Sequence, residues 1–363
     1  MTVERSVVMT GFKHLDTLKE LVTLHGGPGF EHDVRARIEQ AFRAYTDDIQ
    51  VDTLGNLVGV IKGEGEGRRP RILLSAHMDE IALVVTHIEK GGFLRVAQAG
   101  GFDPRTLVGQ EVFVHTKSGR LLGIVGSKPP HLTAPEERGK AAPLEDLFID
   151  LATSEDHVRE RVDVGDRVTL SRDVYDLQND RIAGKSLDNR TSVAIILETL
   201  EVLKGLRHVA DVYAVASVQE EVGVRGAATV AYGLNPDIAV AIDVTFGAFP
   251  GQASDEGFVL GGGPAISFGP NLHMKVFRHL TSVAEREGIA YQIELSQGPV
   301  GADARAFQIA RAGIASALVG IPIRYMHTSV ETGSYRDIVA CARLLAHYIA
   351  DVGGDTVEGL SCY

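Results

Sequence analysis

Cysteine is nearly absent from this sequence, since Cys341 and Cys362 are the two in 363 residues. Two cysteines cannot build a disulfide framework or a CxxC metal site, so a reducing compartment is expected. No apolar run approaches the roughly 18 residues of a membrane-spanning helix. The first 22 residues also lack the apolar stretch and small-residue cleavage site of a secretory signal. The sequence therefore predicts a cytoplasmic protein without a membrane partner.

Positive charge is also in short supply. The chain has 36 lysines and arginines against 48 aspartates and glutamates, a net charge of −12. Binding to nucleic acid or to an anionic membrane needs a cationic surface, so the composition argues against both partners. With 44% apolar and 23% charged residues, the chain can bury a core, which excludes disordered, collagen-like and coiled-coil proteins.

Hydrophobic periodicity divides the chain into three parts. Residues 12–26 and 32–45 have the spacing of two amphipathic helices. Residues 80–180 contain short strands between glycine, proline and charged turns, a pattern typical of a small all-β barrel or sandwich. After residue 182, helical segments alternate with buried strands, as in a sheet with helices on both faces.

The sequence therefore predicts an α/β fold whose mixed sheet, covered by helices on both faces, is interrupted by an inserted small all-β domain. The α/β domain would comprise residues 1–78 and 182–363, and the insert residues 79–181. Two such domains agree with a soft expectation of roughly 150 residues per domain.

Ionisable side chains follow the predicted buried strands. Three strands are each followed at once by a histidine or by acidic residues, a second histidine comes shortly after a fourth strand, and an aspartate opens a long predicted helix. In an open α/β sheet, ligands bind in the crevice at the carboxyl ends of the strands. The group comprises His77, Asp79, Asp188, Glu220, Glu221, Asp243 and His327.

Five of these residues have an ordinary structural explanation when they are taken alone. His77 resembles a core histidine with a backbone partner, and Asp188 resembles a helix N-cap. Glu220 and Glu221 suit a solvated loop, and Asp243 suits a turn. The set is harder to explain in this way, because buried acidic groups must be paired or bind metal.

Two imidazoles and three carboxylates are enough ligands for two metal ions if one carboxylate bridges both. Mixed nitrogen and oxygen ligands without thiolates suit Zn²⁺, Co²⁺ or Mn²⁺. Two such ions about 3.5–4 Å apart can stabilise the attacking and leaving oxygens of a hydrolysis. The predicted ligands are His77, Asp188, Glu221, Asp243 and His327.

Hydrolysis at such a centre also needs a base that takes the proton of water. Adjacent glutamates in a loop can point in different directions, so Glu220 and Glu221 could supply one base and one metal ligand. Asp79, two residues beyond His77, could hold the second nitrogen of that imidazole, as acids behind metal-ligating histidines commonly do.

Nine segments, in this order along the chain, carry a resemblance to a known family: SAHMDEIALVV, GSKPPHL, EDLFIDLA, VGDRV, KSLDNR, VQEEVGVRGA, AIDVT, GGGPAI and IPIRYMHTSVE. Through them the sequence resembles the tetrahedral aminopeptidases and glutamyl aminopeptidases, a family of dimetal exopeptidases. AHMDE in combination with EEVGVRG is specific to this family.

The resemblance implies a zinc-exopeptidase-like fold and an aminopeptidase that removes N-terminal residues from short peptides. It implies two divalent metal ions per subunit, zinc or cobalt first and manganese as a further candidate. Asp188 would bridge the two ions, Glu220 would be the catalytic base, and Asp79 would orient His77. The other ligands would form two pairs, His77 with Asp243 and Glu221 with His327.

The resemblance also implies an assembly. The insert resembles the dimerisation domain of the family, whose members typically form a hollow tetrahedral dodecamer that admits unfolded peptides. We therefore expect a homo-oligomer that acts on short peptides.

Three positions depart from the family pattern or lack a role. Where the family often has Gly-Gly-Thr-Asp-Ala, residues 300–304 are Val-Gly-Ala-Asp-Ala, so Ala302 lacks the threonine hydroxyl. His131 matches a family motif without an evident chemical role. Arg324, near His327, could offer a cation to an acidic substrate side chain or form a structural ion pair.

Other functions stay open at this point. Another dimetal amidohydrolase on the same frame, such as a deacylase or a carboxypeptidase, is the first alternative. A glycosidase also uses paired carboxylates, although it would not need the two histidines. A metal-dependent scaffold without catalytic activity is the last alternative.

Overall fold

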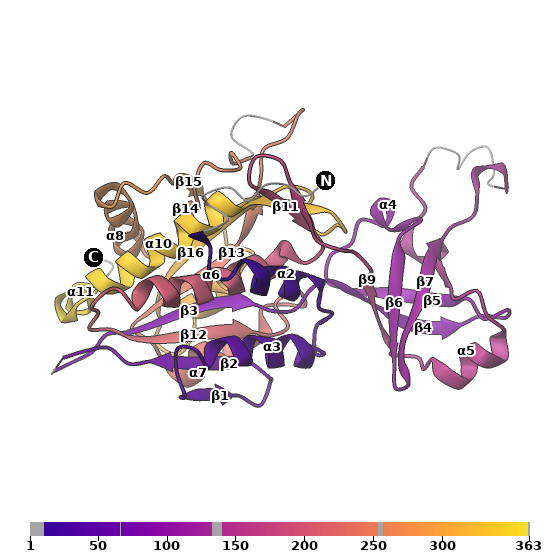
Figure 1. Ribbon diagram of the computed structural model, residues 1–363, viewed down its shortest axis with the longest axis horizontal. Helices are drawn as coiled ribbons and strands as arrows, with labels where there is room; N and C mark the ends of the chain where they lie inside the picture. The colour runs from indigo at the N-terminus through magenta and orange to yellow at the C-terminus, as the bar shows by residue number, and fades with distance from the viewer. Residues whose placement is uncertain (1–10, 66, 133–139, 253–256, 362–363) are drawn as a thin grey trace.

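The largest element of the fold is an eight-stranded mixed sheet (Figure 1) in a computed structural model that describes residues 11–65, 67–132, 140–252 and 257–361. The four central strands are parallel, and strands on both sides of them add antiparallel pairs. In spatial order the strands are β1 (Ile49–Val51), β2 (Leu57–Ile61), β12 (Asp211–Ser217), β3 (Arg71–His77), β13 (Ile238–Phe246), β16 (Ala315–Ile323), β14 (Ala265–Phe268) and β15 (Gln292–Leu295).

Helices cover both faces of this sheet, as the alternation of helical and strand segments predicts. One face packs against the larger hydrophobic core, under α2 (Leu15–Thr23), α3 (His32–Phe42), α6 (Leu187–Leu203), α8 (Met274–Arg286) and α10 (Tyr335–Asp351). The opposite face packs against a smaller core under α7 (Arg225–Leu234) and α9 (Ala304–Gln308). The mixed α/β architecture is therefore confirmed, although α9 is shorter than its helical pattern suggests.

Side-chain alternation decides which strand residues can face the site. On β3, Ile72 and Leu74 belong to the core under α6, whereas Leu73 belongs to the core under α7 and α9. Because successive side chains of a strand point to opposite faces, His77 lies on the side of Leu73. The same alternation places Asp243 of β13 on that side, with Ala239 and Ala241.

The inserted segment forms a closed six-stranded barrel beside the main sheet (Figure 1). Its strands close in the order β4 (Ala82–Ile88), β5 (Leu94–Ala99), β8 (Phe148–Asp150), β7 (Gly119–Gly126), β6 (Glu111–Thr116) and β9 (Arg167–Leu170). A separate apolar core fills the barrel. Two short helices, α4 (Pro104–Leu107) and α5 (Glu155–Arg161), and two 3-10 turns, η1 (Pro130–Leu132) and η2 (Leu144–Asp146), accompany it.

A small third sheet was not predicted from the sequence. It consists of β10 (Tyr175–Leu177), β11 (Arg181–Gly184) and β17 (Glu331–Ser334), all antiparallel. The chain thus returns from the barrel by pairing with a segment close to the C-terminal helices α10 and α11 (Gly354–Glu358). This pairing brings the start of α6 next to the loop that carries His327.

The structure also bears on the predictions about membrane-spanning helices and cysteines. Among the described residues, no helix is both long enough and apolar enough to cross a membrane. Cys341 is buried and free. Cys362 and the first ten residues lie outside the described part of the chain.

Candidate metal centre and active site

His77 stands at the end of β3 with both ring nitrogens engaged. Its Nε2 lies 3.1 Å from Oδ1 of Asp188 and 3.7 Å from Oδ1 of Asp243. Its Nδ1 lies 3.2 Å from the backbone oxygen of Asp79 and 3.5 Å from that residue's carboxylate. The imidazole is 2% exposed, so it is held rigidly with Nε2 directed toward the acids.

Asp188 lies between the two histidines. Its Oδ2 is 3.2 Å from Nε2 of His327, while Oδ1 contacts His77. The residue sits at the start of α6, where its peptide bond to Asn189 is cis. The side-chain amide of Asn189 donates to the backbone oxygen of Ile242 at 2.9 Å, which joins the start of α6 to β13. One carboxylate thus reaches both imidazoles, which come from distant parts of the chain.

Glu220 and Glu221 occupy the turn after β12 and point to different partners. Oε1 of Glu221 lies 3.4 Å from Nε2 of His327, whereas Oε2 of Glu220 lies 4.0 Å from Nε2 of His77. Asp79 fixes this turn, because its two carboxylate oxygens accept the backbone N–H groups of Glu220 and Glu221, each at 3.1 Å. Asp79 therefore braces both the imidazole of His77 and the adjacent glutamates.

Burial and mutual repulsion dominate the electrostatics of the acids. Burial raises the pKa of Glu220 to about 10, and the carboxylates of Asp243, Asp303 and Glu221 add to this rise against the attraction of His77. Burial likewise raises the pKa of Glu221 and, by a wide margin, that of Asp243. Such a concentration of buried carboxylates needs positive charge nearby to become ionised.

The histidines shift in the complementary direction. Burial alone would lower the pKa of His77, but its bonds to Asp188 and Asp79 outweigh burial and raise the pKa well above 6.5. The pKa of His327 rises to about 11, because Asp188 and Glu221 outweigh burial. Asp188 itself has a lowered pKa, since its bonds to His327 and His77 outweigh its burial. These shifts favour the protonated form of both imidazoles beside the acids.

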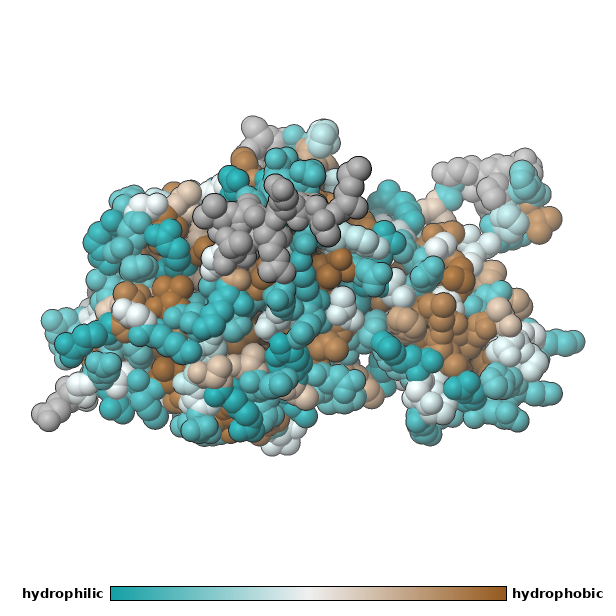
Figure 2. Space-filling view, in the orientation of Figure 1, coloured by the Kyte–Doolittle hydropathy of each residue, from teal (hydrophilic) through white to brown (hydrophobic). Residues whose placement is uncertain are grey.

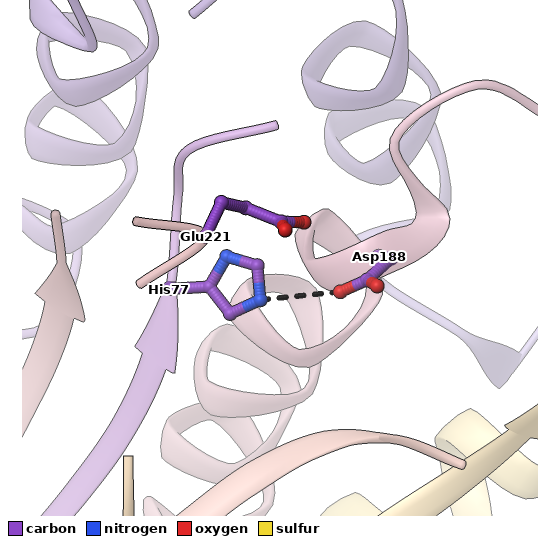
Figure 3. A group of neighbouring side chains, drawn as sticks. All are labelled: His77, Asp188 and Glu221. Atoms are coloured by element: carbon purple, nitrogen blue, oxygen red, sulfur yellow. Dashed lines mark hydrogen bonds and ion pairs between the residues drawn. The ribbon is translucent and has the colours of Figure 1, made fainter. Parts of the chain in front are cut away.

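The donor set fits divalent cations. One atom each from His77, Asp188 and Glu221 lies within 4.8 Å of the others, close enough to share one ion. Figure 3 shows the His77 ring and the Asp188 carboxylate directed at each other, with the Glu221 carboxylate beside them. Imidazole and carboxylate ligands suit zinc, cobalt or manganese. A cation would neutralise the acids that otherwise need protons.

Two buried acids near the centre were missed by the sequence analysis. Oε1 of Glu331 accepts the backbone N–H of His327 at 2.8 Å, and its Oε2 accepts that of Asp188 at 2.9 Å. Glu331 therefore ties together the loops of two predicted ligands. The only signal in the sequence was its place four residues after His327 in HTSVE.

Asp303 is the second missed acid. It is 3% exposed, and its Oδ2 accepts both the Ser75 and Ser217 hydroxyls at 2.7 Å. Burial raises its pKa. These hydroxyls come from β3 and β12, so Asp303 fastens the start of α9 to the two strands that precede His77 and the glutamate turn.

The three positions left without a role also have places in the structure. Nε of Arg324 donates a hydrogen bond to the backbone oxygen of Ala248 at 2.6 Å, so its guanidinium stabilises the local backbone. Ala302 is buried in the apolar core under α9, where its methyl group needs no hydrogen-bond partner. His131 is exposed on η1 of the barrel.

A cavity of about 620 Å³ opens over the centre. His77, Asp188, Glu220, Glu221, Asp243 and His327 all contribute to its lining. The barrel contributes Gly101, where an added Cβ would lie 3.1 Å from Nδ1 of His327. The inserted segment therefore forms part of the wall of this cavity.

The sheet with its inserted barrel, together with this site, defines a hydrolase of the zinc-exopeptidase-like fold. A sequence profile described as M42 glutamyl aminopeptidase matches residues 55–344, so the chain belongs to this family. It is 35% identical to a lysyl aminopeptidase of Pyrococcus furiosus over 330 residues, 89% of this chain and 93% of the relative. It is 28% identical to a glutamyl aminopeptidase of Lactococcus lactis over 363 residues, 96% and 99% of the two chains.

Solved structures agree with this assignment. An aminopeptidase of the archaeon Desulfurococcus kamchatkensis superposes with a TM-score of 0.89 at 38% identity, over 96% of this chain and 98% of that chain. The TET1 peptidase of Pyrococcus horikoshii superposes with a TM-score of 0.82 at 32% identity, over 94% and 100%. The predicted family, fold and enzyme class are confirmed: the chain is a peptide hydrolase of the aminopeptidase type.

Proposed function

We propose that the protein removes single residues from the free N-terminus of short peptides at a centre of two divalent metal ions. The observation that carries this proposal is the position of Asp188, whose two carboxylate oxygens lie 3.1 and 3.2 Å from the Nε2 atoms of two different histidines. A carboxylate that points one oxygen toward each of two histidines has the arrangement required of a ligand that bridges two ions.

The neighbours of Asp188 divide into the two proposed ligand pairs. Nε2 of His77 lies 3.7 Å from Asp243, and Nε2 of His327 lies 3.4 Å from Glu221. The group of His77, Asp188 and Glu221 includes one residue of each pair and the proposed bridge, and we assign His77 and Asp243 to one ion and Glu221 and His327 to the other. Zinc or cobalt fits this donor set first, and manganese is a further candidate.

Glu220 is the proposed general base. When bound, two divalent cations polarise a scissile carbonyl and lower the pKa of a water molecule. Glu220 lies in the cavity without a place in either ligand pair, so its carboxylate is free to accept the proton of the attacking water. The same group then delivers that proton to the leaving amine. Asp79 acts by position, because it holds His77 and the turn of Glu220.

We place the inserted domain at residues 79–181, between the two parts of the α/β domain, 1–78 and 182–363. The barrel of this inserted domain is the proposed surface for self-association. Strand β7 exposes Leu122 by 55% and Ile124 by 44%, and Figure 2 shows hydrophobic surface over the barrel. The Pyrococcus horikoshii relative is described as able to assemble into a tetrahedron or a large octahedral shell. We infer a homo-oligomer, with a tetrahedral dodecamer as the proposed form. Its location in the cytoplasm stays a prediction.

Replacement of the base tests the mechanism. In Glu220→Gln, both metals should stay bound because the residue is not a proposed ligand, while kcat falls by about 10²- to 10⁴-fold. Metal content by atomic absorption and turnover of an aminoacyl substrate measure the two effects. Glu64→Gln, at a surface glutamate 61% exposed, is the matched control and should retain full activity. Substantial activity in Glu220→Gln would refute the base assignment.

The position of cleavage tests the reaction class. The enzyme should cleave a peptide with a free N-terminus and leave the acetylated version of the same peptide intact. Products can be read by mass spectrometry. Equal cleavage of the two peptides would favour a deacylase or another amidohydrolase instead.

A further inference from the structure

A carboxylate without a place in the proposed centre lies in the same cavity. Glu294 of β15 contributes to the cavity lining. Its Oε1 accepts the hydroxyl of Thr245 at 2.7 Å, and its Oε2 accepts the hydroxyl of Ser267 at 2.5 Å. Thr245 is 5% and Ser267 1% exposed, so buried donors fix the carboxylate. An ionised carboxylate has about four acceptor positions, which leaves further positions for a ligand.

The neighbouring strand is shaped to let Glu294 reach this place. Glu294 pairs with Ser267 on β14, whereas Thr245 lies on β13, on the far side of β16. The residue of β16 between them is Gly320, where an added Cβ would lie 3.0 Å from the Thr245 side chain and 3.6 Å from Oε2 of Glu294. The glycine leaves the space through which the Glu294 side chain extends toward the centre.

The spacing of Thr245 and Asp243 along β13 suits one long side chain between Glu294 and the centre. Thr245 follows Asp243 by two residues on β13, so both side chains are on the same face, roughly 7 Å apart along the strand. A substrate carbonyl at the centre would have its own side chain directed along this interval. An extended lysine side chain spans roughly 6 Å from Cα to Nζ, which matches the interval.

Apolar side chains also line this part of the cavity. Leu318 and Val300 are buried walls, and Phe246 and Leu295 are more exposed. Aliphatic walls that end in a fixed carboxylate suit a side chain with a hydrocarbon stem and a terminal cation. Arg305 also lines the cavity but is exposed to solvent, where water weakens its attraction for an acidic side chain.

We propose that Glu294 selects substrates whose first residue is lysine or arginine. This inference rests on the proposed aminopeptidase function, in which the cavity receives the first side chain. Lysine is distinguished from its uncharged analogue norleucine by the cation alone. The Glu294 carboxylate forms a charge-assisted hydrogen bond with that cation, whereas norleucine gains only the apolar contacts.

The test compares kcat/KM for lysyl, arginyl, norleucyl and glutamyl aminocoumarin substrates in the metal-loaded enzyme. We expect lysine and arginine to exceed norleucine in the natural enzyme. Glu294→Gln should lower kcat/KM for lysine roughly 10- to 100-fold and leave norleucine little changed. Glu294→Asp, which keeps the charge, should retain part of the preference. Calorimetric binding of lysinamide and norleucinamide, without turnover, should show the same loss in Glu294→Gln.

The outcomes separate this inference from the function on which it rests. Cleavage of none of the four substrates would refute the aminopeptidase mechanism. Cleavage without preference for lysine or arginine, or an equal loss for lysine and norleucine in Glu294→Gln, would overturn the role of Glu294 alone. A glutamate preference that disappears in Arg305→Gln would also overturn it and would assign selection to Arg305.

Discussion

Removal of divalent cations should make the folded protein lose stability as the pH rises above neutral. The acids of the centre have raised pKa values: about 10 for Glu220, with Asp243 and Glu221 also raised. The pKa of His327 is raised to about 11, and that of His77 is also raised. The folded metal-free protein therefore holds protons that the unfolded chain releases.

The sign and size follow from proton linkage. A group with a raised pKa contributes its full stability below its unfolded pKa and loses it as the pH climbs toward the folded value. For Glu220, this window runs from 4.5 to about 10, and each extra proton held by the folded state costs about 1.4 kcal/mol per pH unit. Glu220 alone thus removes about 3 kcal/mol between pH 7 and 9. The lowered pKa of Asp188 acts only in acid, outside this window.

Chemical denaturation of chelator-treated protein at fixed concentration measures this effect. The free energy of unfolding should fall steadily from about pH 7 to about pH 9. Protein loaded with zinc should show a much smaller slope, because bound cations replace the protons. Glu220→Gln should reduce the metal-free slope by about one proton, or 1.4 kcal/mol per pH unit. A metal-free stability that is flat or rises over this range would refute the reasoning.

Two further predictions test parts of the frame. The buried carboxylate of Glu80 accepts a hydrogen bond from Lys185 at 2.6 Å, so Glu80→Gln should lower the free energy of unfolding by about 3–5 kcal/mol. Glu64→Gln, which removes an exposed ion pair, should lower it by under about 1 kcal/mol. Equal losses for the two variants in denaturant titrations would contradict this. Gly101→Ala places a Cβ 3.1 Å from His327 Nδ1 and should weaken metal binding roughly tenfold. Chelator competition measures this affinity, and an unchanged value would show that the barrel does not constrain His327.

Much of the fold was predictable because its signals are local. Alternating strands and helices after residue 182 and the short, turn-rich segments before it indicate an α/β sheet and a small β domain, and both are present. The sheet of β10, β11 and β17 was not predictable, because β17 pairs with a hairpin about 150 residues earlier in the chain. Such a pairing leaves no periodic pattern in either segment.

The candidate site likewise contains residues that were predictable from the sequence and residues that were not. His77 and Asp243 were recognisable because each directly follows an apolar run typical of a buried strand, and ligands of an α/β sheet gather at such places. The structure brings both close to Asp188, although β13 continues past Asp243 to Phe246. Their roles as metal ligands stay predictions. Glu331 and Glu294 were missed because their importance lies in contacts with distant backbone and hydroxyl groups. Arg324 had a suggestive sequence neighbour in His327, yet its guanidinium serves the backbone of Ala248.

The spacing of the clustered residues along the chain has a consequence during synthesis. Their contributions begin at His77 and end at His327, in the segment that joins β16 to β17. A ribosome-bound chain that has not yet released this last stretch lacks one of the two imidazoles that Asp188 contacts. Peptide cleavage should therefore begin only once the segment that carries His327 has been synthesised and has folded against Asp188.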